Sequence, residues 1–113
     1  MSTTFTTIHT DSHRGDDWPD AWEETVTRVE GDLADKIRGK VGAAPEADVQ
    51  IVERGDEGGY SEWTVEWDWS FRVEVAGIGN VWESDGYSQV DFDDTDGRFA
   101  HNALTRFIEW VNQ

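Results

Sequence analysis

The chain has 113 residues, 36% of them hydrophobic and 12% aromatic, which is typical of one folded domain and excludes an intrinsically disordered chain. Its 25 Asp and Glu against 9 Lys and Arg give a formal net charge of -16, which excludes direct binding to nucleic acid or to an anionic membrane surface. The sequence has no cysteine and no apolar run long enough to span a bilayer, so disulfides and thiolate catalysis are excluded and a cytoplasmic protein is expected.

Residues 1–17 are rich in Thr, Ser and Asp, with Phe5 and Ile8 as apolar anchors. This composition predicts an N-terminal arm or a short edge strand. We expect residues 18–113 to form a single α+β domain.

A helix is predicted to begin at Pro19 and to end before Gly42, because proline favours the first turn of a helix and glycine favours its cap. Apolar residues recur through this segment at helical spacing: Trp22, Val26, Val29, Leu33, Ile37 and Val41. Within such a helix, Gly31 and Gly39 would each cost about 1 kcal/mol relative to alanine.

Three strands are predicted next. The first is short, Val49 to Arg54, and a turn over residues 55–59 follows it. The second runs from Ser61 to Val75 with unbroken alternation of apolar and polar residues, and its unusual length predicts a bend or a bulge within it. The third follows a turn at 77–80, and Ser84 to Gly86 mark a bulge or a second turn within it.

Asp94, Thr95 and Asp96 are predicted N-caps of a final helix with an apolar stripe that includes Phe107 and Val111. The predicted fold is therefore α+β, with a three-stranded (or four-stranded) antiparallel sheet, two helices packed on one face, and the order (β)-α-β-β-β-α. At the level of fold, the order helix, three strands, helix resembles that of double-stranded RNA-binding domains, but the charge has the wrong sign for RNA.

The polar face of the long strands is the principal candidate site. If both helices cover the tryptophan-rich face, the opposite face presents a regular array of carboxylates with Arg72 among them. Its acidic residues are Glu62, Glu66, Asp68, Glu74, Glu83, Asp85, Asp91 and Asp93. Such an array favours a basic protein surface as partner, including the surface of a nucleic-acid-binding protein.

Other residue clusters are weaker candidates. His9 and His13, with acidic residues nearby, are potential metal ligands, but the segment lacks the helical pattern that would bring two such histidines onto one face. The acidic run 91–97 does not fit a calcium loop when its glycine is aligned with the loop glycine. The seven tryptophans are assigned mainly to the core. We predict no catalytic residues, no metal and no cofactor.

The functional hypothesis is a small non-enzymatic binding protein that docks its acidic sheet face on a basic partner, as an inhibitor, an antitoxin or a nucleic-acid mimic does. The predicted helices packed on a short antiparallel sheet resemble those of small acidic inhibitors made by viruses and mobile elements, including some anti-CRISPR proteins and DNA mimics. One alternative is a salt-adapted (halophilic) accessory domain whose acidity reflects its environment. Another is a small ligand-binding or enzymatic domain with a pocket between sheet and helices, beside Trp63 or Trp67.

Overall fold

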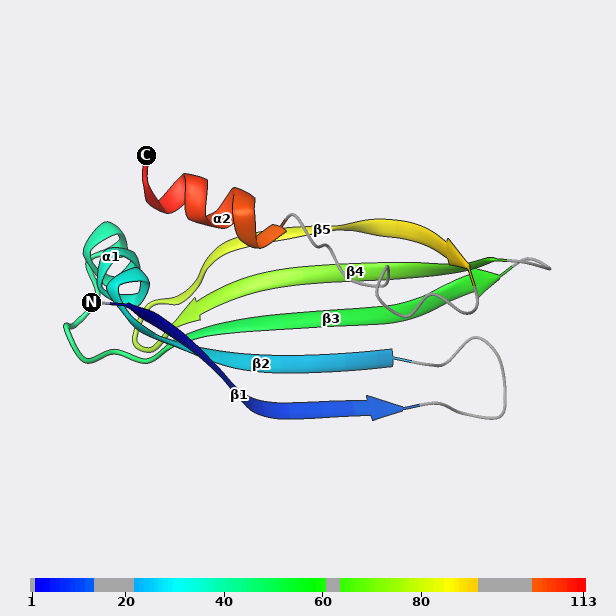
Figure 1. The fold of residues 1–113 in the computed structure, drawn as a ribbon, viewed down its shortest axis with the longest axis horizontal. Helices are drawn as coiled ribbons and strands as arrows, with labels where there is room; N and C mark the ends of the chain where they lie inside the picture. The colour runs from blue at the N-terminus through cyan, green and yellow to red at the C-terminus, as the bar shows by residue number, and fades with distance from the viewer. Residues whose placement is uncertain (1, 14–21, 61–63, 92–102) are drawn as a thin grey trace.

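The computed structural model describes residues 2–13, 22–60, 64–91 and 103–113 (Figure 1). The described residues form a five-stranded antiparallel sheet in the order β1-β2-β3-β4-β5 and two helices. The strands are β1 (Thr3–His13), β2 (Trp22–Gly31), β3 (Val49–Tyr60), β4 (Thr64–Val75) and β5 (Gly79–Asp91), and the helices are α1 (Asp32–Val41) and α2 (Ala103–Val111). No helix in these ranges is long and apolar enough to cross a membrane.

The predicted three-stranded sheet is wrong, because two further strands precede the first predicted one. The segment Trp22–Gly31, predicted as the first half of a helix, forms β2 and pairs with both β1 and β3. Four of the five residues from Thr25 to Val29 are β-branched, which restricts side-chain rotamers in a helix and favours a strand. The element order therefore also differs from that of double-stranded RNA-binding domains.

Strand β2 passes directly into α1 at Gly31. This residue has φ 92° and ψ -147°, a conformation in which a Cβ atom is strained, and a Cβ there would also collide with the backbone carbonyl of Ser2. Helix α1 then ends at Gly42, which has the left-handed conformation expected of a helix cap. Gly31 is therefore the junction between strand and helix rather than a residue in the middle of a long helix.

The long strand predicted from Ser61 to Val75 is confirmed from Thr64 onward, and the first three residues lie outside the described residues. The irregularities fall in its two neighbours rather than within it. Strand β3 has an extra residue between Glu57 and Gly59, and β5 has one at Val81. The predicted turn over residues 55–59 is wrong, because β3 continues through it to Tyr60.

The core lies between one face of the sheet and both helices. On this face, called the helix face, the buried residues are Val29, Val49, Ile51, Phe71, Val73 and Val75. Leu33 and Ile37 from α1 pack against them, as do Phe107 and Val111 from α2, so the predicted burial of Phe107 and Val111 is confirmed. The predicted caps at residues 94–96 lie outside the described residues. Both helices lie near one end of the sheet, and the strands extend well beyond them (Figure 1).

Two glycines, one predicted in a turn and the other in a bulge or turn, lie on either side of Trp69. Gly55 in β3 and Gly86 in β5 are the direct cross-strand partners of Trp69 in β4. A Cβ at Gly86 would lie 2.8 Å from Cζ2 of the Trp69 ring, closer than van der Waals contact allows. The glycine therefore makes room for the indole, as strand glycines do beneath aromatic residues.

We predict that Gly86→Ala displaces the Trp69 ring and destabilises the protein by about 1–3 kcal/mol, the usual range for overpacking. Gly39→Ala is the matched control, because a Cβ at this position in α1 meets no atom within 4 Å. That control should be stabilised by about 0.5–1 kcal/mol. Urea unfolding and near-ultraviolet circular dichroism measure both effects, and equal stabilities of the two variants would contradict the contact.

Candidate functional site

The face of the sheet opposite the helix face, called the open face, carries most of the charged side chains of the strands. Cross-strand pairing places its residues in register, because directly opposed residues share a face. From β2 to β5 they include Glu24, Val26, Arg28, Val52, Arg54, Asp56, Asp68, Ser70, Arg72, Glu74, Glu83 and Asp85. The helices that the structure describes pack on the other side.

Four of the predicted acidic residues lie together on this face. Asp68 and Glu74 come from β4, while Glu83 and Asp85 come from β5, where they oppose Arg72 and Ser70. Glu66 and Asp91 occupy β4 and β5 and pair with Gln89 and Thr64 respectively, but their side chains are not described. The remaining two predicted residues, Glu62 and Asp93, lie outside the described residues.

Three aspartates from neighbouring strands border one recess. Asp56 in β3 lies directly opposite Asp68 in β4. Asp85 in β5 is the diagonal neighbour of Asp68, two residues before the residue that lies directly opposite it. Together with Ser70, Trp69 and Gly86 they line a surface recess of about 380 Å³. Like charges on directly opposed residues destabilise a sheet unless a cation compensates them.

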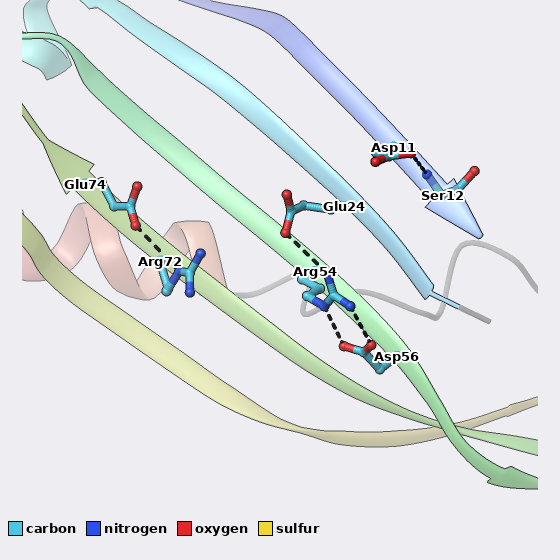
Figure 2. A network of polar contacts seen from close by, with 7 residues as sticks. All are labelled: Asp11, Ser12, Glu24, Arg54, Asp56, Arg72 and Glu74. Carbon is cyan, nitrogen blue, oxygen red and sulfur yellow. Dashed lines mark hydrogen bonds and ion pairs between the residues drawn. The ribbon is translucent and has the colours of Figure 1, made fainter. Parts of the chain in front are cut away.

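Arg54 compensates part of this charge (Figure 2). Its Nε donates to Asp56 Oδ2 at 2.9 Å and its Nη2 to Asp56 Oδ1 at 3.0 Å, a bidentate pair, while Nη1 lies 3.5 Å from Glu24 Oε2. The guanidinium also stacks on Trp22, with Cζ 4.6 Å from the ring centre. Hydrogen bonding to Asp56, with a smaller contribution from Glu24, raises the pKa of Arg54.

Among the described residues, no cation compensates the other two aspartates of the recess in this way. Within the described ranges, the ion pairs of the open face join Arg54 to Asp56 and Glu24, and Arg72 to Glu74 at 3.8 Å. Asp68 and Asp85 are both exposed and take part in none of them. The recess therefore keeps a local excess of negative charge, focused on Asp68 and Asp85.

The centre of the open face is more basic than the sequence predicted. Arg28 and Arg54 join Arg72 around Val52, which is only 6% exposed although no described helix covers it. The stems of long arginines cover apolar surface in this way while their charged ends reach water. Nε of Arg28 and Nε of Arg72 are shielded from solvent and make no hydrogen bond to a described residue. The sequence analysis placed only Arg72 among the carboxylates, so it missed Arg28 and Arg54 on this face.

Sequence reasoning missed Glu24 and Asp56. Glu24 was assigned to a helix, and Asp56 was assigned to a turn after Arg54. Every second residue of β3 faces the open side, so Asp56 follows Gln50, Val52 and Arg54 on this face. Extending the predicted strand by two residues beyond Arg54 would have placed Asp56 in the candidate site.

The structure separates the two histidines considered as metal ligands. His9 and His13 lie in β1, where four residues of strand span roughly 13 Å, whereas one turn of helix would bring residues of this spacing to about 5–6 Å. The nearby Asp16 and Asp17 lie outside the described residues. In the part of the chain that the structure describes, no three His, Asp or Glu side chains gather to hold a metal ion.

Two other hollows lie elsewhere. A recess of about 510 Å³ adjoins the turn between β4 and β5, where Glu74 and Ile78 contribute to its walls. A groove of about 230 Å³ lies at the sheet edge, bordered by Phe5, Leu33 and Ile108. Trp63 and the side chain of Trp67 lie outside what the structure describes, so a pocket beside them stays a prediction.

Comparisons of the chain with family models, with characterised proteins and with solved structures gave no match. The geometry and charge of the open face are therefore the basis for a proposed function.

Proposed function

We propose that this chain is a small non-enzymatic binding protein whose open face docks on a basic protein surface, of the kind that nucleic-acid-binding proteins present. The supporting observation is the recess bordered by Asp56, Asp68 and Asp85, because two of its three carboxylates lack a cation among the described residues. A lysine or arginine of a partner would supply that charge. In this role the chain acts as an inhibitor, an antitoxin or a nucleic-acid mimic.

The shape of the sheet also supports this mode of binding. The molecule is elongated, with principal-axis extents of 49 × 25 × 23 Å. The strands extend beyond the helices, so the open face is long. Carboxylates on adjacent strands are about 5 Å apart and those along one strand about 6.7 Å apart, which offers closely spaced acceptors to several basic side chains. Arg28, Arg54 and Arg72 surround Val52 on this face. They repel the basic side chains of a partner that is docked over Val52, and so favour the position in which those side chains meet the recess.

The test separates a specific site from general acidity. Asp68→Asn/Asp85→Asn removes two negative charges from the recess, and Glu46→Gln/Glu109→Gln removes the same charge from exposed positions in the loop before β3 and in α2. The tagged protein and both variants are used to capture proteins from extracts of the source cell at low salt. We expect the wild type and the Glu46/Glu109 variant to retain the same basic protein, and the recess variant to lose it.

Affinity for that protein should fall about tenfold or more in the recess variant and should decline steeply as salt rises. Equal losses in both variants would show that the acidity acts through net charge alone, as expected of a salt-adapted domain. Retention by both variants would contradict the proposed site.

A further inference from the structure

The outer edge of β1 differs from the rest of the sheet in its charge. Each of the other four strands contains three acidic residues, whereas β1 contains only Asp11. Residues 2–10 contain no acid at all, in a chain of net charge -16. Two copies of this chain repel one another strongly, so this edge is where two sheets approach with the least electrostatic cost.

The same edge exposes apolar side chains. Phe5 is 45% exposed and Ile8 39%, and the remaining large hydrophobic residue exposed in the described ranges, Ile78, lies in the turn between β4 and β5. Phe5 also borders the groove of about 230 Å³ that Leu33 and Ile108 line on the helix face. Exposed strand edges with apolar residues and few charges are templates for pairing with another strand.

A bulge limits how much of the edge is regular. The pairing of β1 with β2 shifts between Thr7 and His9, which leaves Ile8 as the extra residue. Bulges disrupt the ladder locally and twist the strand. The regular part before the bulge, Thr3 to Thr7, has Phe5 at its centre.

We propose that two copies of this chain pair through β1, antiparallel, about a twofold axis at Phe5. This register places Phe5 opposite Phe5 of the partner subunit, Thr3 opposite Thr7 of the partner subunit, and Thr4 opposite Thr6 of the partner subunit. Threonine and aromatic cross-strand pairs each stabilise a sheet, and threonine has high strand propensity. Asp11 stays beyond the ladder, so the paired segments bring no carboxylate of one copy opposite a carboxylate of the other.

The pairing has a geometric consequence for the open face. Opposed residues share a face, so both Phe5 side chains lie on the helix side, each beside the groove at its own edge. The two open faces then lie on the same side of one continuous ten-stranded sheet. The dimer does not depend on the proposed function, because it forms at the β1 edge and the acidic recess lies on β3, β4 and β5.

Its salt dependence is also opposite to that of the proposed partner. Added salt screens the repulsion between two chains of charge -16, so the dimer should strengthen as salt rises. Binding of a basic partner to the acidic recess should weaken over the same range. Failure of one proposal is therefore distinguishable from failure of the other.

Single introduced cysteines test the register of the two β1 strands. The chain has no cysteine of its own, so any disulfide must join the introduced residues. Opposed residues of an antiparallel pair have Cα atoms about 4.5–5.5 Å apart, within the range that a disulfide spans, whereas diagonal residues are about 7–8 Å apart. Thr4→Cys mixed with Thr6→Cys should therefore form a disulfide-linked dimer under mild oxidation, at high salt. Either variant alone should cross-link much more slowly, and so should Ile78→Cys.

A charge variant tests the dimer without a disulfide. Thr6 is exposed, so Thr6→Glu and Thr6→Gln should both fold, as circular dichroism checks. Sedimentation equilibrium should show a wild-type dimer that Thr6→Gln keeps, and a dimer that Thr6→Glu weakens about tenfold or more at low salt. A wild type that stays monomeric at high salt, or a mixture that cross-links no faster than the single variants, would overturn the proposal.

Discussion

Phe107→Ala should destabilise the protein by about 3–5 kcal/mol, the range for removing a fully buried phenylalanine. Phe107 is 0% exposed and stands at the centre of the contact between α2 and the sheet. Its ring centre lies 5.4 Å from that of Trp82, 6.3 Å from that of Phe71 and 6.0 Å from that of Trp110. Removal of the ring leaves a cavity between the other three aromatic side chains, which are too large and too constrained to move together and fill it.

The loss is a large part of the roughly 5–15 kcal/mol that stabilises an ordinary domain. Chemical unfolding followed by tryptophan fluorescence measures it. Ile78→Ala serves as the control, because Ile78 is 49% exposed and should change the stability by no more than about 0.5 kcal/mol. A Phe107→Ala variant as stable as this control would show that α2 does not close the core.

Gly31→Ala should cost of the order of 3 kcal/mol or more, because two penalties combine at this position. The backbone there has φ 92°, which strains a residue with a Cβ atom, and the Cβ would also overlap the carbonyl oxygen of Ser2. Relief requires moving the start of β1 away from α1. That movement would break the hydrogen bond from the amide of Leu33 to Thr3 Oγ1, which is 3.0 Å long.

Gly42→Ala isolates the conformational penalty from the collision. Gly42 also has a positive φ, 72°, but a Cβ there meets no atom within 4 Å. We expect this variant to lose only about 1–2 kcal/mol, the cost of the left-handed conformation. Thermal unfolding of both variants measures the difference, and a smaller loss for Gly31→Ala than for Gly42→Ala would argue against the close approach of β1.

The strand Thr64–Val75 and the buried positions of α2 could be predicted because each shows a single periodicity. In β4, odd residues are apolar and even residues are polar along the whole strand, so no other element fits the pattern. In α2, Ala103, Phe107 and Val111 recur every fourth residue. Local pattern and tertiary packing agree in both elements.

Residues 22–31 could not be assigned correctly from apolar spacing alone. Trp22, Val26 and Val29 fit a helical stripe, yet in the strand Val29 faces the core while Trp22 and Val26 lie on the open face. Both faces of β2 carry apolar residues, so the spacing does not distinguish the two structures. The β-branched run from Thr25 and the glycine at 31 were the signals that favoured a strand with a helix after it.

The glycines of β3 and β5 made these strands look shorter in the sequence than they are in the structure. Glycine in sequence usually indicates a turn, but Gly55 and Gly86 are strand residues opposite Trp69, and Gly86 leaves room for the Trp69 ring. Ending the first predicted strand at Arg54 also removed Asp56 from the candidate site. The position of Arg54 against Glu24 and Asp56 depends on pairing between strands distant in sequence, which no local pattern contains.

We propose above that the recess of Asp56, Asp68 and Asp85 on the open face binds cationic side chains. Amide NMR spectra recorded during titration with an arginine-rich synthetic peptide test it most directly, at a salt concentration that suppresses weak general attraction. We predict that the largest shifts fall on Asp68, Asp85 and their neighbours in β3 to β5, and that they vanish in Asp68→Asn/Asp85→Asn but not in Glu46→Gln/Glu109→Gln. Shifts spread evenly over the exposed acids of the helices and loops would contradict it.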